Sequence, residues 1–190
     1  MIFFSKYLLI VALFFISLSC QIKNQNDFTY IGIKEKLLSE CDSAFSKDYS
    51  FTIKQIHKSQ FRSMPEIKHL INKGLEEVVV LNFTSYKDVQ KNTKLSFLIF
   101  LCEYESSRRA KSIFSNLEKV KSSQDETIFS KDWDYLSLDK NIILRMDATC
   151  LYSKESWQKL KDNFIMIKMK IMPNGSNANI IECFCGGSCK

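Results

Sequence analysis

Apolar residues recur at helical spacing in the first half of the chain. In residues 33–47 they fall on one stripe, which predicts a helix with a buried face: Ile33, Leu37, Leu38, Cys41 and Phe45. Residues 63–74 show the same period between a capping Ser63 with Pro65 in the first turn and a terminating Gly74. We therefore expect two helices before residue 75.

Two runs rich in β-branched and aromatic residues follow, at 76–86 and 94–104, and predict strands separated by a polar loop at 87–93. Residues 95–101 are almost continuously apolar. Strands with both faces buried have this pattern, whereas half-exposed strands alternate. The second run therefore predicts a central strand.

A strand–helix pattern then occurs twice, at 97–120 and 141–164. Each copy has an apolar strand, a cysteine near its end, a serine that can cap a helix, and an amphipathic helix. The caps are Ser106 or Ser107 in the first copy and Ser153 in the second. Residues 133–146 between the helices predict a hairpin that turns at 138–141, and the alternation in 164–172 predicts a further strand. The chain then turns at 173–175 and returns as residues 179–185.

The order strand, helix, strand, strand, helix, strand is that of the split βαβ, or ferredoxin-like, plan. We therefore predict an α+β fold: an antiparallel sheet with helices on one face, a ferredoxin-like core and an N-terminal helical extension. In that plan the first and third strands are neighbours at the centre of the sheet. This placement would bring Cys102 and Cys150 within reach of each other, provided that their side chains face suitably.

Composition indicates one globular domain, which we place at residues 31–190. The chain has 190 residues, 45% of them hydrophobic and 13% aromatic, enough to build a core. Its net charge is +6, and the basic residues are interleaved with acidic ones. Because nucleic-acid binding usually requires a concentrated basic face and a recognisable module, we expect no nucleic-acid partner.

The first residues have the layout of a signal peptide, which we place at 1–19. Lys6 precedes an apolar run from Tyr7 to Ile16, and small serines follow at 17 and 19. An uncleaved anchor is the alternative, although the run is short for a membrane span.

Residues 16–20, "ISLSC", resemble the lipobox of bacterial prolipoproteins. The resemblance covers residues 1–20 only. It implies that Cys20 receives a diacylglyceryl group and becomes the first residue of the mature protein. The polar residues 20–30 would then be a tether between a lipid-anchored end and the domain. Ordinary cleavage at the same bond, leaving Cys20 unmodified in a secreted protein, is the rival interpretation.

Cysteine parity favours lipidation, because the chain has seven cysteines and an odd one in an exported protein needs an explanation. With Cys20 acylated, six remain as disulfide candidates: Cys41, Cys102, Cys150, Cys183, Cys185 and Cys189. We expect them to pair, with the tail 183–189 fastened to the body of the domain. The alternative is an exported thiol or metal-binding protein that uses the C-terminal cysteines.

The chain has no recognisable catalytic motif, so we expect a non-enzymatic protein without a cofactor. Residues 132–135 carry two acids and two aromatics and can be interpreted as a sugar- or peptide-binding patch or as the two faces of one strand. His57 and His69 lie among lysines and are interpreted as surface residues. The sequence therefore predicts a lipid-anchored protein of the cell envelope that binds an unidentified protein or small molecule. A hydrolase with a dispersed active site is a weaker alternative.

Overall fold

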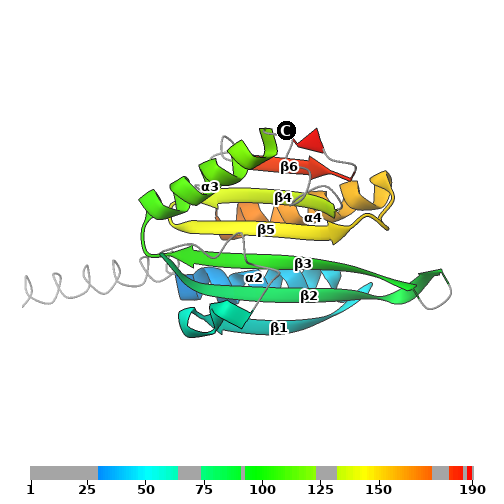
Figure 1. Cartoon of the computed structure of the whole chain (residues 1–190). Coiled ribbons are helices and arrows are strands. Elements are labelled where there is room, and N and C mark those ends of the chain that lie inside the picture. The colour runs from blue at the N-terminus through cyan, green and yellow to red at the C-terminus, as the bar shows by residue number, and fades with distance from the viewer. Residues whose placement is uncertain are drawn as a thin grey trace, which may run out of the picture.

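The structure is a computed structural model that describes residues 30–63, 74–90, 93–122, 132–172, 180–185 and 188–189. These residues form one seven-stranded antiparallel sheet, in the order β1-β2-β3-β5-β4-β6-β7, with helices on both faces (Figure 1). The elements are α2 (Tyr30–Phe45), β1 (Tyr49–His57), the 3-10 helix η1 (Lys58–Ser63), β2 (Leu75–Gln90), β3 (Thr93–Tyr104), α3 (Ser107–Ser122), β4 (Asp132–Asp139), β5 (Ile142–Thr149), α4 (Lys154–Ile171), β6 (Ile180–Phe184) and β7 (Ser188–Cys189). The predicted α+β class with an antiparallel sheet is confirmed.

Strand β3 lies between β2 and β5, near the middle of the sheet. Its side chains alternate between two separate cores, with Phe97, Ile99 and Leu101 in one and Phe100 and Cys102 in the other. All five are buried. The prediction of a central strand buried on both faces is therefore confirmed, and so is the prediction that this strand neighbours the one at 142–149.

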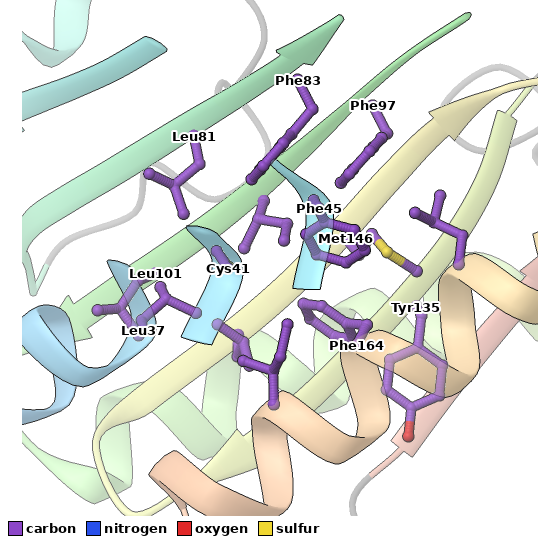
Figure 2. Close-up of a cluster of buried hydrophobic side chains, with 14 of the residues drawn as sticks. Leu37, Cys41, Phe45, Leu81, Phe83, Phe97, Leu101, Tyr135, Met146 and Phe164 are labelled. Carbon is purple, nitrogen blue, oxygen red and sulfur yellow. The ribbon is translucent and has the colours of Figure 1, made fainter. Parts of the chain in front are cut away.

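Helices α2 and α4 cover one face of the sheet and enclose the larger core (Figures 1 and 2). Its centre is aromatic: the rings of Phe83 and Phe97 stack with centroids 4.4 Å apart, and the Phe45 ring meets both edge-on at 5.3 and 5.1 Å. Pairs in these geometries add to the free energy gained from burial alone. The helical stripe predicted in residues 33–47 thus packs its phenylalanine against two adjacent strands.

Helix α3 packs on the opposite face (Figure 1), so the prediction of helices on one face is wrong. Its apolar residues Ala110, Ile113, Phe114 and Leu117 belong to the second core, with Phe100 and Cys102 of β3. The physical reason is the continuous apolar run in β3. Both of its faces carry large apolar side chains, and each face needs a cover to exclude water.

The strand order also departs from the ferredoxin-like plan, because β6 pairs with β4 and does not pair with β3. The free edge of β3 is already taken by β2, which runs antiparallel to it over most of its length. With that edge hydrogen-bonded, the returning chain adds to the other side of the hairpin formed by β4 and β5.

Residues 164–171 are helical, so the strand predicted at 164–172 is wrong. Phe164, Ile167 and Ile171 continue the buried face of α4 at helical spacing, while Met166 and Met169 are exposed. The apparent alternation therefore arises from exposed methionines between buried residues. Ser153 caps this helix as predicted, and its Oγ accepts a hydrogen bond from the Ser156 N–H at 3.2 Å.

Two further findings concern the first half of the chain. No element is predicted at 49–57, where β1 forms an edge strand of mostly exposed residues. The predicted helix at 63–74 lies outside the described residues except at its two ends, of which Gly74 has a φ of +106°.

None of the helices that the structure describes is long and apolar enough to cross a membrane.

Replacing Phe97 by alanine should lower the free energy of unfolding by about 3–5 kcal/mol, because the change removes a buried ring and leaves a cavity. Chemical denaturation followed by circular dichroism measures this value. The matched control is Ile53→Ala on β1, where the side chain is 53% exposed and the change should have little effect. Equal losses in the two variants would contradict the core described here.

Candidate functional site

A disulfide joins Cys150 to Cys185, with Cα atoms 5.6 Å apart. Cys150 follows the last residue of β5, and Cys185 follows the last residue of β6. Strand β4 lies between these two strands, so the bridge links both neighbours of β4 close to the residue where β4 begins. The bond therefore fastens the short strand β6, which lies next to the edge strand β7, to the centre of the sheet.

Cys183 is also disulfide-bonded. In the ladder between β6 and β7, its partner in register is Cys189. Two of the three C-terminal cysteines thus carry disulfides, and neither of these sulfurs is available as a thiolate ligand while it is oxidised. Among the residues that the structure describes, no three histidine, cysteine or acidic side chains gather closely enough to hold a metal ion.

Cys41 and Cys102 are free and buried, so the expectation that all six cysteines pair is wrong for these two. They lie in the two different cores, on opposite faces of the sheet. Cys102 pairs in register with Ile143, whereas Cys150 follows the far end of that strand, which separates the two cysteines that the predicted plan brought together. Burial raises the pKa of both thiols to about 12. Both therefore act as small apolar side chains.

The predicted ligand patch at 132–135 is buried for the three residues whose side chains are described, Trp133, Asp134 and Tyr135. The alternative interpretation, two faces of one strand, fits the structure. Trp133 stacks on Trp157 of α4 with ring centroids 5.4 Å apart, and Tyr135 meets a ring of the same helix edge-on. Asp134 lies in β4 between these two aromatics, so its side chain faces the opposite side of the sheet.

Asp134 forms a buried ion pair with Arg145, whose Nε donates to Oδ1 at 2.9 Å. A second carboxylate, Asp147, accepts from Nη2 at 2.8 Å, and the guanidinium lies 5.5 Å from the centroid of the Phe100 ring. Burial opposes the charge of Arg145, but the two carboxylates hold its pKa above the ordinary value. Removing one partner of such a pair would leave an uncompensated buried charge, so we expect the loss of either side chain to destabilise the fold.

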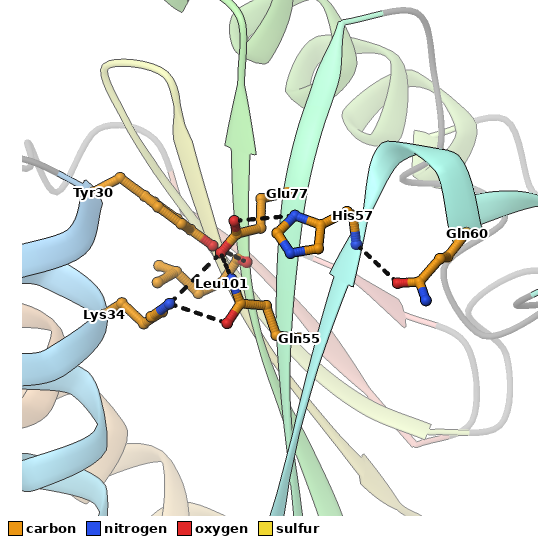
Figure 3. A network of polar contacts seen from close by, with 7 residues as sticks. All are labelled: Tyr30, Lys34, Gln55, His57, Gln60, Glu77 and Leu101. Atoms are coloured by element: carbon orange, nitrogen blue, oxygen red, sulfur yellow. Dashed lines mark hydrogen bonds and ion pairs between the residues drawn. The ribbon is translucent and has the colours of Figure 1, made fainter.

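His57 belongs to a polar network that holds α2 against β1 and β2 (Figure 3). Its Nδ1 lies 3.5 Å from Glu77 Oε2, and Glu77 Oε1 accepts from Gln55 Nε2 at 2.8 Å. Lys34 of α2 donates to Gln55 Oε1 at 3.1 Å, and the Tyr30 hydroxyl donates to the Leu101 carbonyl at 3.4 Å. The His57 side chain is 62% exposed, as the sequence predicts for a surface histidine. His69 lies outside the described residues, as does Cys20.

A pocket of about 240 Å³ lies where the turn between α2 and β1 meets the far end of β2. Its walls come from two short segments and one residue of β3: Lys47, Asp48, Tyr49, Ser85, Tyr86, Lys87, Asp88 and Leu95. Concave sites with a few convergent polar groups are where proteins usually bind small molecules. This pocket is therefore the candidate binding site.

One wall of the pocket is a β-bulge. In the ladder between β2 and β3, Thr84 pairs with Ser96 and Asp88 with Lys94, so residues 85–87 lie opposite Leu95 alone. The Ser85 hydroxyl compensates for the interrupted ladder: it accepts from the Leu95 N–H at 3.0 Å and donates to the Lys87 carbonyl at 2.8 Å. Bulges of this kind redirect side chains and are frequent beside functional sites.

The bulge is also tied to the opposite wall, because the Tyr86 N–H donates to the Asp48 carbonyl at 3.0 Å. Sequence reasoning missed this site, since the polar residues 87–93 predict a loop, whereas β2 continues to Gln90 and β3 begins at Thr93. A Lys-Asp pair occurs at 47–48 and at 87–88, but also at 131–132 and 161–162, so the sequence alone does not single out the pocket. The first two pairs are forty residues apart in sequence and line the same pocket.

No protein-family description, curated protein or solved structure shows significant similarity to this chain.

Replacing Cys150 and Cys185 together by serine should lower the free energy of unfolding by about 2–4 kcal/mol, the usual contribution of a disulfide. Urea denaturation of both proteins, with and without reductant, measures the loss. Reductant should then destabilise the double variant less than the wild type, because this bond is already absent from it. Unchanged stability in the double variant would contradict the fastening role assigned to the bond.

Proposed function

We propose that the chain is an exported protein, anchored to a membrane by lipid on Cys20, whose domain binds a small ligand in the pocket between residues 47–49 and 85–88. The observation that carries the proposal is the disulfide between Cys150 and Cys185. Structural disulfides persist in oxidising compartments and are rare in the cytosol. This chemistry supports export, in agreement with the apolar N-terminal segment that ends at Cys20.

The position of Cys20 suits an anchor that leaves the domain in water. It precedes the first residue of α2 by ten positions, and residues 21–27 are mostly polar. A multiply acylated cysteine is held firmly, because each buried CH₂ group contributes about 0.8 kcal/mol. The domain would thus stay at the membrane surface with its pocket open to solvent.

The pocket supports binding better than catalysis. Its lining contains neither a histidine nor a cysteine, and the hydroxyl of its buried serine, Ser85, is engaged both as donor and as acceptor. Asp48 and Asp88 have free lone pairs but are exposed, and a general base works on a nucleophile or substrate that is positioned beside it. The exposed lysines and aspartates instead offer donors and acceptors to a bound molecule.

We infer that the second disulfide joins Cys183 to Cys189. Cys183 is disulfide-bonded and lies opposite Cys189 in the ladder, where Cα atoms of paired residues are within the range that a disulfide spans. With both bridges oxidised, the C-terminal cysteines hold the edge of the sheet. This arrangement argues against the alternative that they bind a metal or exchange electrons.

The Cys20→Ser variant should be released from membranes, because serine cannot form the thioether to a diacylglyceryl group. The experiment expresses wild type and variant in a bacterial host and compares the membrane and soluble fractions after an alkaline wash. The control is Gln21→Ala, which changes the neighbouring residue, keeps the cysteine and should remain in the membrane fraction. If Cys20→Ser stays in the washed membranes as fully as the control, the lipid anchor is wrong.

A further inference from the structure

The charges around the pocket are balanced. Lys47 and Asp48 lie on the turn, Lys87 lies on the bulge with Asp88 directly after it, and all four side chains are exposed. Two ammonium groups and two carboxylates give the rim no net charge. A polyanion would be repelled by the aspartates and a polycation by the lysines, so the rim favours a ligand without a large charge of its own.

The pocket also offers apolar surface. Tyr86 is 55% exposed, and its backbone is held by the hydrogen bond to Asp48 described above. Tyr49 is half-buried: its ring meets the Phe97 ring edge-on with centroids 5.1 Å apart, and its hydroxyl accepts from the Tyr152 hydroxyl at 3.5 Å. An aromatic side chain in a fixed place supplies contact area at little conformational cost.

We propose that this pocket binds a neutral saccharide. The inference rests on the proposed function, because it names the ligand class of the same site. A sugar ring has an apolar C–H face that packs on an aromatic side chain, and hydroxyl groups that donate and accept hydrogen bonds. Aspartate accepts and lysine donates, so each Lys-Asp pair can engage neighbouring hydroxyls of one ring.

The geometry assigns separate roles to the two walls. The bulge supplies Tyr86 for the apolar face, with Lys87 and Asp88 beside it, and the turn supplies Lys47 and Asp48 from the other side. Because Ser85 and the Tyr86 N–H fix the two walls to each other and to β3, the backbone of the site is in place before a ligand binds. A preformed site loses less entropy when it binds.

The test is a titration of the full-length mature protein in detergent micelles, followed by ¹H–¹⁵N NMR. The probes are N-acetylglucosamine and methyl β-glucoside as neutral sugars, with glycylglycine as a zwitterion of comparable size. We expect saturable shifts with at least one neutral sugar, concentrated at residues 47–49 and 85–88. Tyr86→Ala should weaken binding by about tenfold through the loss of one aromatic contact.

Two further variants separate ligand contact from general destabilisation. Asp88→Asn should also weaken binding, whereas the control Asp162→Asn, on the exposed face of α4 away from the pocket, should bind as the wild type does. No shift with either sugar, shifts elsewhere on the molecule, or undiminished binding by Tyr86→Ala would overturn the proposal. Binding of glycylglycine without either sugar would also overturn it. None of these results bears on the anchor, which the membrane fractionation tests separately.

Discussion

The structure depends on the burial of both faces of its two central strands. Side chains of β3 and β5 alternate between the two cores. Because both faces of these strands carry apolar side chains, both faces must be covered to exclude water. One helix layer cannot cover such a sheet. Helices α2 and α4 therefore enclose one face while α3 covers the other, and the buried pair of Arg145 and Asp134 is accommodated next to the second core.

The disulfide and the pocket lie near the two edges of the sheet, away from its buried centre. At one edge the disulfide of Cys150 and Cys185 holds the short strand β6 beside the hairpin of β4 and β5. Near the other edge, the bulge of β2 and the turn before β1 form the pocket. Neither feature disturbs the cores, so peripheral residues are free to serve binding while the aromatic interior supplies stability.

The sequence pattern predicted the parts of the fold that local periodicity determines. The stripe through Leu37 and Cys41, the cap at Ser153, the hairpin turn after Asp139 and the buried strand at 95–101 all have local signals. Strand order has no local signal, because it depends on which strand pairs with each edge of β3, and β2 takes the edge that the ferredoxin-like plan would give to β6. The same limit applies to the pocket, since no local pattern brings Lys47 near Lys87.

The most direct test of the account is the intact mass of the protein from its native membrane, alkylated in denaturant before and after reduction. The account predicts an acyl increment on Cys20, two alkyl groups before reduction, from Cys41 and Cys102, and six after it. In the folded protein these two thiols should resist alkylation near pH 8, because burial keeps them protonated. A mass without acyl groups, or more than two reactive thiols before reduction, would contradict an exported, lipid-anchored and disulfide-fastened domain.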